Sequence, residues 1–481
     1  MNTPLLDALK NRGNHPHSPF YVPGHKQGKG ISRQLSELWG ETVFRYDLPE
    51  LPEFGGLFPP EGVMKTAQEL AANAFGAEKT WFLANGSTSG VMAAILATCG
   101  EGDKIILPRN AHQSAIAALI FSGAIPIFIN PIYDPSFDLP YTLTVEAVKQ
   151  TLSQHQDAKA IFIVSPTYQG ICADIQALAT LAHSQNLPLI VDAAHGAHFG
   201  FHPQLPASPL TQGADVVIQS LHKTLGALTQ ASLLHLQGER VNPSRLSTAL
   251  QCLQSSSPSH LLLASLDAAR DQVATQGKHL FDYTLDLVAK GKAGIEKISD
   301  LTLLNPSLPQ AGCYDFDTTR ITVNVEKLGL TGFAADEILH NELNVTAELP
   351  TAKTLTFVIT FGNTVADIEA LVTGLSQLRQ YKPQTSLVPL KLSGLPPLAE
   401  CISPRKAFFQ EKTVLPLAET VGKISAELVC PYPPGIPVLI PGEIITIEAL
   451  NYLQQVFQLG HNITITGCSD VTLQELQVIT T

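Results

Sequence analysis

The sequence predicts an α/β fold with a mainly parallel β-sheet. From residue 61 onward, short apolar segments alternate with stretches of helical periodicity. The apolar segments are hydrophobic at successive positions, which is typical of strands that are buried on both faces. Small and polar residues follow several of these segments, and ligands bind at the carboxyl ends of parallel strands. These observations predict one composite site at that edge of the sheet.

Each element of the large domain is expected from this alternation. Strands are expected at 80–83, 104–107, 125–129, 160–164, 188–191, 216–219 and 231–236. Helices are expected at 64–75, 88–98, 112–122, 145–154 and 175–185, and a long helical region at 261–290. A second unit follows, with strands at 320–325 and 354–360 and helices at 334–341 and 365–378.

The chain of 481 residues is too long for a single hydrophobic core. We expect an N-terminal arm over 1–60, which begins with a short helical stretch around Leu5 to Leu9 and has an irregular, proline-containing segment at 41–60. A cofactor-binding large domain is expected over 61–275. A small α/β domain is expected over 276–385 and a C-terminal α+β domain over 386–481. A linker rich in Pro, Lys and Ser over 380–397 precedes the C-terminal domain.

Composition narrows the class of protein. The net charge of −12 is spread along the chain, which argues against a nucleic-acid partner. The seven cysteines are scattered without a CxxC spacing, so neither a disulfide framework nor a structural zinc site is expected. No apolar run reaches the ~20 residues of a membrane span, and no signal peptide is evident. We therefore expect a cytoplasmic protein. His195 and His198 lack an evident third ligand, so no metal is expected.

Lys223 and Asp192 form the most informative pair. Asp192 closes one apolar strand, and Lys223 stands about thirty residues later, shortly after the next strand. Enzymes that use pyridoxal phosphate (PLP) have this arrangement. The lysine holds the cofactor as a Schiff base, and the aspartate keeps the pyridine nitrogen protonated, so the ring becomes an electron sink. The pair predicts PLP as the cofactor.

Three further motifs follow strands. Ser87 and Thr88 open a helix, where free backbone amides and hydroxyls form an anion site for the cofactor phosphate; simple helix capping is the alternative. His112 is placed to lie flat on the cofactor ring, or is an ordinary histidine at a helix start. Thr167 is placed to bond the phenolic oxygen of the cofactor, or belongs to an ordinary Pro/Gly turn.

With these motifs in view, the chain resembles the Orn/Lys/Arg decarboxylases, in the shorter form without an N-terminal wing domain. The resemblance runs nearly end to end. The segments that carry it are 19–28, 85–89, 109–114, 192–198, 220–230, 257–258, 264–267 and 432–443. It implies a large domain of the PLP-dependent transferase type, as in aspartate aminotransferase.

The resemblance also implies roles for individual residues. Lys223 is similar to the Schiff-base lysine and Asp192 to the partner of the pyridine nitrogen. The implied phosphate ligands are Ser87, Thr88, Ser220 and His222. His112 resembles the histidine that stacks on the ring, and His195 the one beside the cofactor. Family members form dimers or higher assemblies with sites at the subunit interface, where Ser256 and Ser257 are expected to reach the partner subunit's phosphate.

Some positions depart from the family pattern. Ala193 and Ala194 stand where relatives often carry glutamate or serine, and His260 stands where a tyrosine is expected. Lys406 replaces an expected glutamate in the C-terminal domain, which reverses the charge. If that position forms the substrate entrance or a subunit contact, specificity differs from that of the relatives.

The expected reaction is α-decarboxylation of a basic L-amino acid, with arginine first and lysine or ornithine next. Lys223, His222, Asp192 and His112 are the expected catalytic residues, and His222 or Lys223 returns a proton to Cα. The acids that could bind the distal cation of the substrate are Asp47, Glu50, Glu53, Asp174 and Glu427.

Two other functions fit the same residues. One is an aminotransferase or lyase on the same scaffold, in which Arg320 would bind the substrate carboxylate. The other is a non-catalytic protein of this fold that binds an amino acid or a partner, against which the intact set of Lys223, Asp192 and His112 argues.

Overall fold

The structure is a computed structural model that describes residues 2–381, 402–432, 435–458 and 464–480. It contains two compact units, one of Met1–Ala97 and Ile190–Leu280 and the other of Thr98–Leu189 and Phe281–Thr481. The predicted domain limits at 60, 275 and 385 stay predictions. Most of the predicted linker 380–397 lies outside the described residues.

Four strands form the sheet of the first unit. Their order is β1 (Lys79–Leu83), β10 (Ser232–Leu236), β9 (Val216–Ser220) and β8 (Leu189–Asp192). β10 is antiparallel to both of its neighbours, whereas β9 and β8 are parallel. Every residue of β8, β9 and β10 is buried, as the apolar runs in the sequence predict.

Helices of the first unit pack closely on these strands. α4 (Gly62–Phe75) ends at Gly76, whose φ of +74° is a left-handed conformation that favours glycine. In α5 (Gly86–Thr98), a Cβ atom on Gly90 would lie 2.7 Å from Leu83 and 3.1 Å from Ile218. The absence of a side chain at Gly90 therefore lets α5 approach β1 and β9. α9 (Leu221–Thr224) and α10 (Pro243–Leu253) complete the region.

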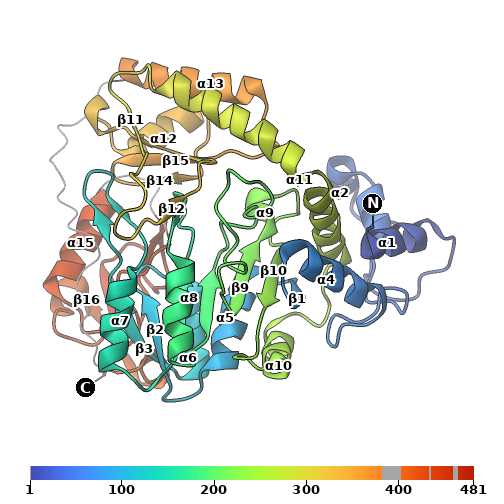
Figure 1. Ribbon diagram of the computed structural model, residues 1–481, viewed down its shortest axis with the longest axis horizontal. Helices are drawn as coiled ribbons and strands as arrows, with labels where there is room; N and C mark the ends of the chain where they lie inside the picture. The colour runs from blue at the N-terminus through green and yellow to red at the C-terminus, as the bar shows by residue number, and fades with distance from the viewer. Residues whose placement is uncertain (1, 382–401, 433–434, 459–463, 481) are drawn as a thin grey trace. The chain divides into compact units, whose positions relative to one another are not determined.

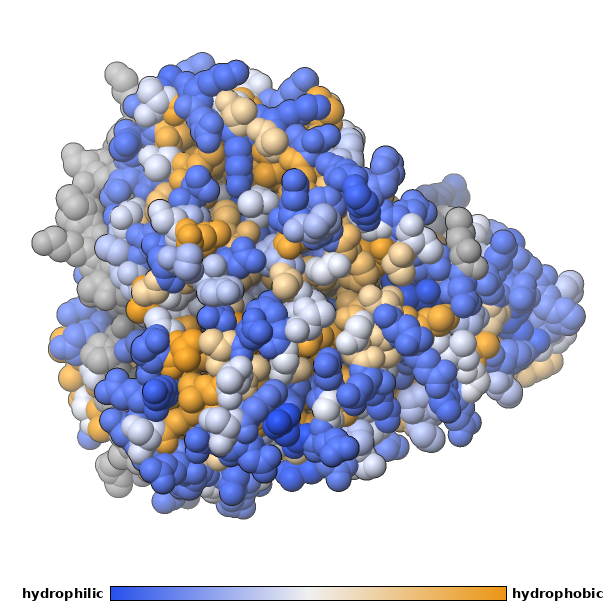
Figure 2. Space-filling model, in the orientation of Figure 1, coloured by the Kyte–Doolittle hydropathy of each residue, from blue (hydrophilic) through white to orange (hydrophobic). Residues whose placement is uncertain are grey.

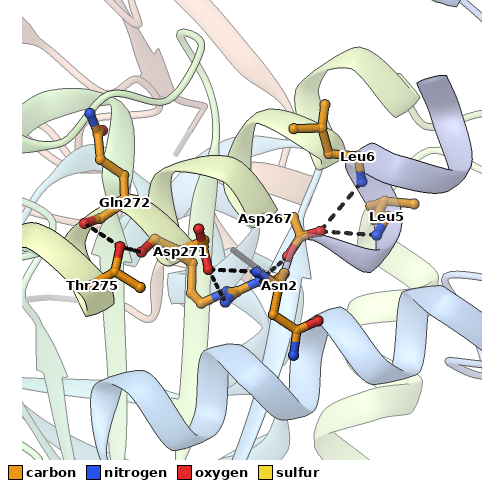
Figure 3. A network of polar contacts seen from close by, with 8 residues as sticks. Asn2, Leu5, Leu6, Asp267, Asp271, Gln272 and Thr275 are labelled. Atoms are coloured by element: carbon orange, nitrogen blue, oxygen red, sulfur yellow. Dashed lines mark hydrogen bonds and ion pairs between the residues drawn. The ribbon is translucent and has the colours of Figure 1, made fainter.

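The N-terminal arm is anchored on the long helix α11 (His260–Ile295). The carboxylate of Asp267 accepts the backbone N–H groups of Leu5, at 2.9 Å, and of Leu6 in the first turn of α1 (Pro4–Asn14) (Figure 3). Arg270 donates to the same carboxylate, and Asp271 accepts the backbone N–H of Asn2. This network places a negative charge at a helix N-terminus, where it is stabilising.

Two short helices, α2 (Arg33–Trp39) and α3 (Thr42–Tyr46), follow in the arm. The expectation of an irregular segment over 41–60 is thus wrong for Thr42–Tyr46. Phe44 explains the difference, because its side chain is buried and gives this stretch a packed apolar contact.

In the second unit, β6 (Ala158–Val164), β2 (Lys104–Pro108) and β3 (Ile125–Ile129) are parallel neighbours in that order. In chain order, α6 (Gln113–Ser122) follows β2, α7 (Val145–Gln154) precedes β6, and α8 (Ile175–Ser184) follows β6. Thr144 and Asp174 cap α7 and α8 with their side-chain oxygens, which explains where these helices begin. α7 and α8 lie side by side (Figure 1). Three short strands accompany them: β4 (Tyr133–Asp134), β5 (Leu139–Pro140) and β7 (Ile171–Cys172).

The second unit also holds an antiparallel sheet with two helices. Its strand order is β11 (Thr302–Leu303), β13 (Arg320–Asn324), β15 (Thr354–Val358) and β14 (Leu349–Pro350). α12 (Gly332–Asn341) and α13 (Val365–Gln377) bury apolar residues in a core shared with these strands (Figure 1). β12 (Asp315–Phe316) pairs with β7.

A smaller α+β region ends the second unit. Its helices are α14 (Pro404–Phe409) and α15 (Ile447–Gln458). One pair of strands consists of β16 (Lys412–Pro416) and β19 (Glu475–Ile479), and the other of β17 (Cys430–Tyr432) and β18 (Thr464–Thr466). Leu450 and Leu453 of α15 lie in its hydrophobic core.

Hydrophilic residues cover much of the face in Figure 2. Among the described residues, no helix has the length and apolar character of a membrane span.

Candidate active site

Lys223 lies one short turn beyond the end of β9. β9 ends at Ser220, α9 begins at Leu221, and the Lys223 Nζ atom lies 2.9 Å from Nε2 of His195. His195 is almost completely buried and Lys223 is partly buried. A primary amine held beside an imidazole suits covalent and proton-transfer chemistry.

Asp192 is the last residue of β8. Its carboxylate is buried and accepts the backbone N–H of Ala194 at 3.1 Å. β8 pairs in parallel with β9, with Asp192 opposite Ile218. The two strands therefore end at the same edge of the sheet and bring the regions of Asp192 and Lys223 together, as the sequence predicts.

Ser87 and Ser220 meet at the N-terminus of α5. Their Oγ atoms lie 2.7 Å apart, and Gly86 begins the helix with a φ of +73°, a conformation that glycine adopts without strain. Thr88 is exposed in the same turn. Hydroxyls and backbone amides at the start of a 13-residue helix form a site that suits a phosphate group.

His222 is oriented by the backbone of the next strand. Its Nδ1 atom lies 3.0 Å from the carbonyl oxygen of Ala231. Because a carbonyl oxygen only accepts hydrogen bonds, Nδ1 carries the proton. Lys223, His195, Asp192, Ser87, Thr88, Ser220 and His222 all belong to the first unit.

His112 and Thr167 belong to the second unit. His112 precedes α6 and its Nδ1 atom accepts the backbone N–H of Ser114 at 3.2 Å, so the expected helix at 112–122 begins one residue later, with His112 as its cap. Thr167 accepts the N–H of Ile171 at 3.2 Å and closes the loop between β6 and β7. The roles of both residues toward a cofactor stay predictions.

One buried charge pair was not predicted from the sequence. The guanidinium of Arg109, just after β2, donates to the carbonyls of Pro437 at 2.6 Å and Val438 at 2.8 Å, and to Glu443 at 3.2 Å. Both charged side chains are almost completely buried. Burial raises the pKa of Glu443, while Arg109 opposes that rise. The one indication in the sequence was that Arg109 directly follows an apolar strand. A residue there is expected to be buried, and a buried arginine needs a partner.

Each acid proposed for the distal cation of the substrate has a hydrogen-bond or ion-pair partner within the chain. Asp47 lies 3.1 Å from Nε2 of His25, Glu50 accepts the N–H of Leu57 at 2.8 Å, and Glu53 lies 3.4 Å from Arg12. Asp174 caps α8, and Glu427 accepts the backbone N–H groups of Ser469 and Gln477. These contacts give each acid a structural role and do not select one of them for the substrate.

The positions that depart from the family pattern have different surroundings. His260 is buried, donates from Nδ1 to the carbonyl of Leu48 at 3.1 Å and packs against Phe54. Lys406 is exposed on α14, and Ser256 and Ser257 are exposed. Arg320, on which the aminotransferase alternative rests, is completely buried 3.5 Å from Asp317.

Comparisons with known proteins agree with these features. Residues 3–320 match the family described as Orn/Lys/Arg decarboxylase, major domain, and residues 401–463 match Orn/Lys/Arg decarboxylase, C-terminal domain. Arginine decarboxylase of Bacillus subtilis (strain 168) is 38% identical, over 99% of this chain and 98% of its own length. Lysine decarboxylase LdcA of Pseudomonas aeruginosa is 24% identical, over 94% and 75% respectively.

Solved structures share the fold. The lysine decarboxylase LdcF of Francisella novicida has a TM-score of 0.84 at 21% identity, over 99% of this chain and 81% of its own. An alanine–glyoxylate aminotransferase from Nostoc sp. has a TM-score of 0.53 at 17% identity, over 68% and 88%. These matches confirm the expected fold class. With the two family matches and the full-length similarity, they show that the chain belongs to the Orn/Lys/Arg decarboxylase family, whose members decarboxylate basic amino acids.

Proposed function

We propose that the protein uses pyridoxal phosphate to decarboxylate L-arginine, releasing agmatine and CO2. The observation that carries the proposal is the short distance between Lys223 and His195 in a unit that also holds Asp192 and the Ser87–Ser220 pair. Arginine is favoured over lysine and ornithine because arginine decarboxylases match at 38% identity over nearly the whole chain.

The residues present fit this cofactor. Lys223 supplies the primary amine that bonds to the cofactor. The hydroxyls of Ser87 and Ser220, with the start of α5, supply donors for its phosphate, and Thr88 and His222 lie in adjacent positions along the chain. Asp192 supplies the buried carboxylate for the pyridine nitrogen. We further propose that His112 stacks on the ring, that Thr167 bonds its phenolic oxygen and that His195 lies beside it.

Pyridoxal phosphate, when bound, supplies an electron sink for the electron pair that remains after CO2 leaves. Asp192 keeps a proton on the pyridine nitrogen by holding a negative charge beside it. Lys223 or His222 returns one proton to Cα, so the substrate loses its carboxylate as CO2 and gains a hydrogen at that carbon. The side chains of His195 and Asp192 are buried, which limits the access of water to these two groups.

We also propose that the protein acts as a homodimer or higher homo-oligomer, with the site completed at the subunit interface. Ser256 and Ser257 are exposed, as a contact with a partner's phosphate requires. No acid among the distal candidates is assigned to the guanidinium of the substrate.

A substrate panel tests the proposal. Purified protein is incubated with pyridoxal phosphate and equal concentrations of L-arginine, L-lysine or L-ornithine, and amine and CO2 are measured together. Agmatine and CO2 in equal amounts from arginine, with slower reaction of the other two, support the proposal. Preference for lysine or ornithine would reassign the substrate, and keto-acid formation with an added acceptor would favour the aminotransferase alternative.

A further inference from the structure

A row of polar side chains crosses the sheet of the first unit, where nearly every neighbouring residue is apolar. Thr80 of β1, His235 of β10 and Gln219 of β9 are 2%, 0% and 0% exposed. Thr80 lies directly opposite His235 in the antiparallel pair. Buried polar groups are unfavourable unless each is hydrogen-bonded, and apolar side chains would fill the same space without that requirement. The row therefore calls for an explanation beyond packing.

The row forms a continuous chain of hydrogen bonds. Thr80 Oγ1 lies 2.8 Å from His235 Nδ1, His235 Nε2 lies 3.1 Å from Gln219 Oε1, and the Gln219 amide nitrogen donates to the carbonyl of Gly196 at 3.1 Å. The Gly196 carbonyl can only accept, which fixes the orientation of the Gln219 amide. His235 then donates from Nε2 and accepts from Thr80 at Nδ1. Burial lowers the pKa of His235 to about 3, which keeps the ring neutral.

The chain of hydrogen bonds ends beside the candidate active site. Gly196 directly follows His195, whose Nε2 atom lies 2.9 Å from Lys223 Nζ. The Gly196 N–H donates to the carbonyl of Ala193 at 2.8 Å, so this glycine is held through both of its backbone polar groups. Gln219 in turn directly precedes Ser220. One amide side chain thus connects the two segments that supply His195 and Ser220.

We propose that Thr80, His235 and Gln219 are positioning residues that hold the Gly196 peptide, and through it the His195 ring, against Lys223. The proposal rests on the proposed function of Lys223 and adds to it a support for His195 that comes from the strands of the sheet. A neutral row suits this role, because it fixes geometry without adding a charge near the amine.

Gln219→Met tests the proposal, because it removes the amide while keeping the length of the side chain. Gln68→Met is the matched control: Gln68 is also buried, on α4, and its side-chain nitrogen has no hydrogen-bond partner among the described residues. Three quantities are compared: hydrogen exchange of the amides at 194–199 without cofactor, the visible absorbance of bound pyridoxal phosphate, and kcat and KM for arginine.

We expect Gln219→Met to exchange faster at 194–199, to alter the visible band and to lower kcat by up to about 100-fold with little change in KM. Gln68→Met should leave all three as in the wild type. If Gln219→Met matches Gln68→Met, or loses only thermal stability, the proposal is overturned.

Thr80 provides a second test if Gln219→Met does not fold. Thr80→Val removes the hydroxyl at nearly constant shape, whereas Thr80→Ser keeps it. Faster exchange at 194–199 and lower kcat in Thr80→Val, restored in Thr80→Ser, support the row; equal behaviour of the two variants overturns it. A wild-type protein that binds no pyridoxal phosphate would refute the proposed function instead, and the exchange comparison would still decide whether the row holds Gly196.

Discussion

The hydroxyl oxygens of Ser87 and Ser220 lie 2.7 Å apart although 133 residues separate them in sequence. Ser87 belongs to the first turn of α5, and Ser220 is the last residue of β9. This relationship joins a helix N-terminus to the strand that leads to Lys223. A phosphate bound at the N-terminus of α5 would therefore hold a cofactor near the amine of Lys223.

Loss of either hydroxyl should weaken cofactor binding. A hydrogen bond to a charged group contributes about 1.5–3 kcal/mol, so Ser87→Ala and Ser220→Ala should each raise the Kd of pyridoxal phosphate about 10- to 100-fold. Ser89→Ala is the matched control, because the Ser89 hydroxyl donates to the Gly86 carbonyl within the helix. Spectroscopic titration of cofactor-free protein measures the three values. Unchanged Kd in both test variants would place the phosphate elsewhere.

The buried pair of Arg109 and Glu443 should stabilise the second unit. Glu443→Gln leaves the Arg109 guanidinium buried without its counter-charge, and breaking such a pair costs about 3–5 kcal/mol. Glu448→Gln removes the same charge from an exposed position on α15 and should change the free energy of unfolding little. Denaturant unfolding of both variants makes the comparison. Equal stabilities would show that the charge of Glu443 is dispensable.

His235 should make stability depend on pH. Its pKa in the folded protein is lowered from 6.5 to about 3 by burial. Between these values the unfolded chain binds more protons, so this contribution is fully present above about pH 6.5 and declines as the pH falls toward 3. His235→Gln lacks the titrating ring, so the difference in unfolding free energy between wild type and variant should narrow with acidification over that window. A difference that is constant with pH would contradict a neutral, buried His235.

Much of the region around the candidate site could be predicted from short-range sequence patterns, namely apolar runs and helix caps. Asp192 and Lys223 could be paired from sequence because each follows an apolar run, and the runs became the adjacent parallel strands β8 and β9. The helix at 145–154 has its predicted bounds, since Thr144 supplies a cap that is visible in the sequence.

Long-range polar contacts could not be predicted in this way. The partners Arg109 and Glu443 are separated by 334 residues, and neither has a local pattern that identifies the other. The row of Thr80, His235 and Gln219 draws one residue from each of three strands. In sequence only His235 stands inside an apolar run, whereas Thr80 lies near the start of its strand and Gln219 near the end. The strand register places Thr80 opposite His235, and Gln219 is two residues along β9 from Val217, the residue opposite His235.

The most direct test of the account is to locate the covalent attachment of the cofactor. Borohydride fixes pyridoxal phosphate irreversibly to the amine that holds it, and peptide mass spectrometry identifies that amine. The wild-type protein and Lys65→Ala, which changes an exposed lysine on α4, should both carry the label at Lys223, whereas Lys223→Ala should carry none and release no CO2 from arginine. A label on another lysine, or full activity in Lys223→Ala, would contradict the account.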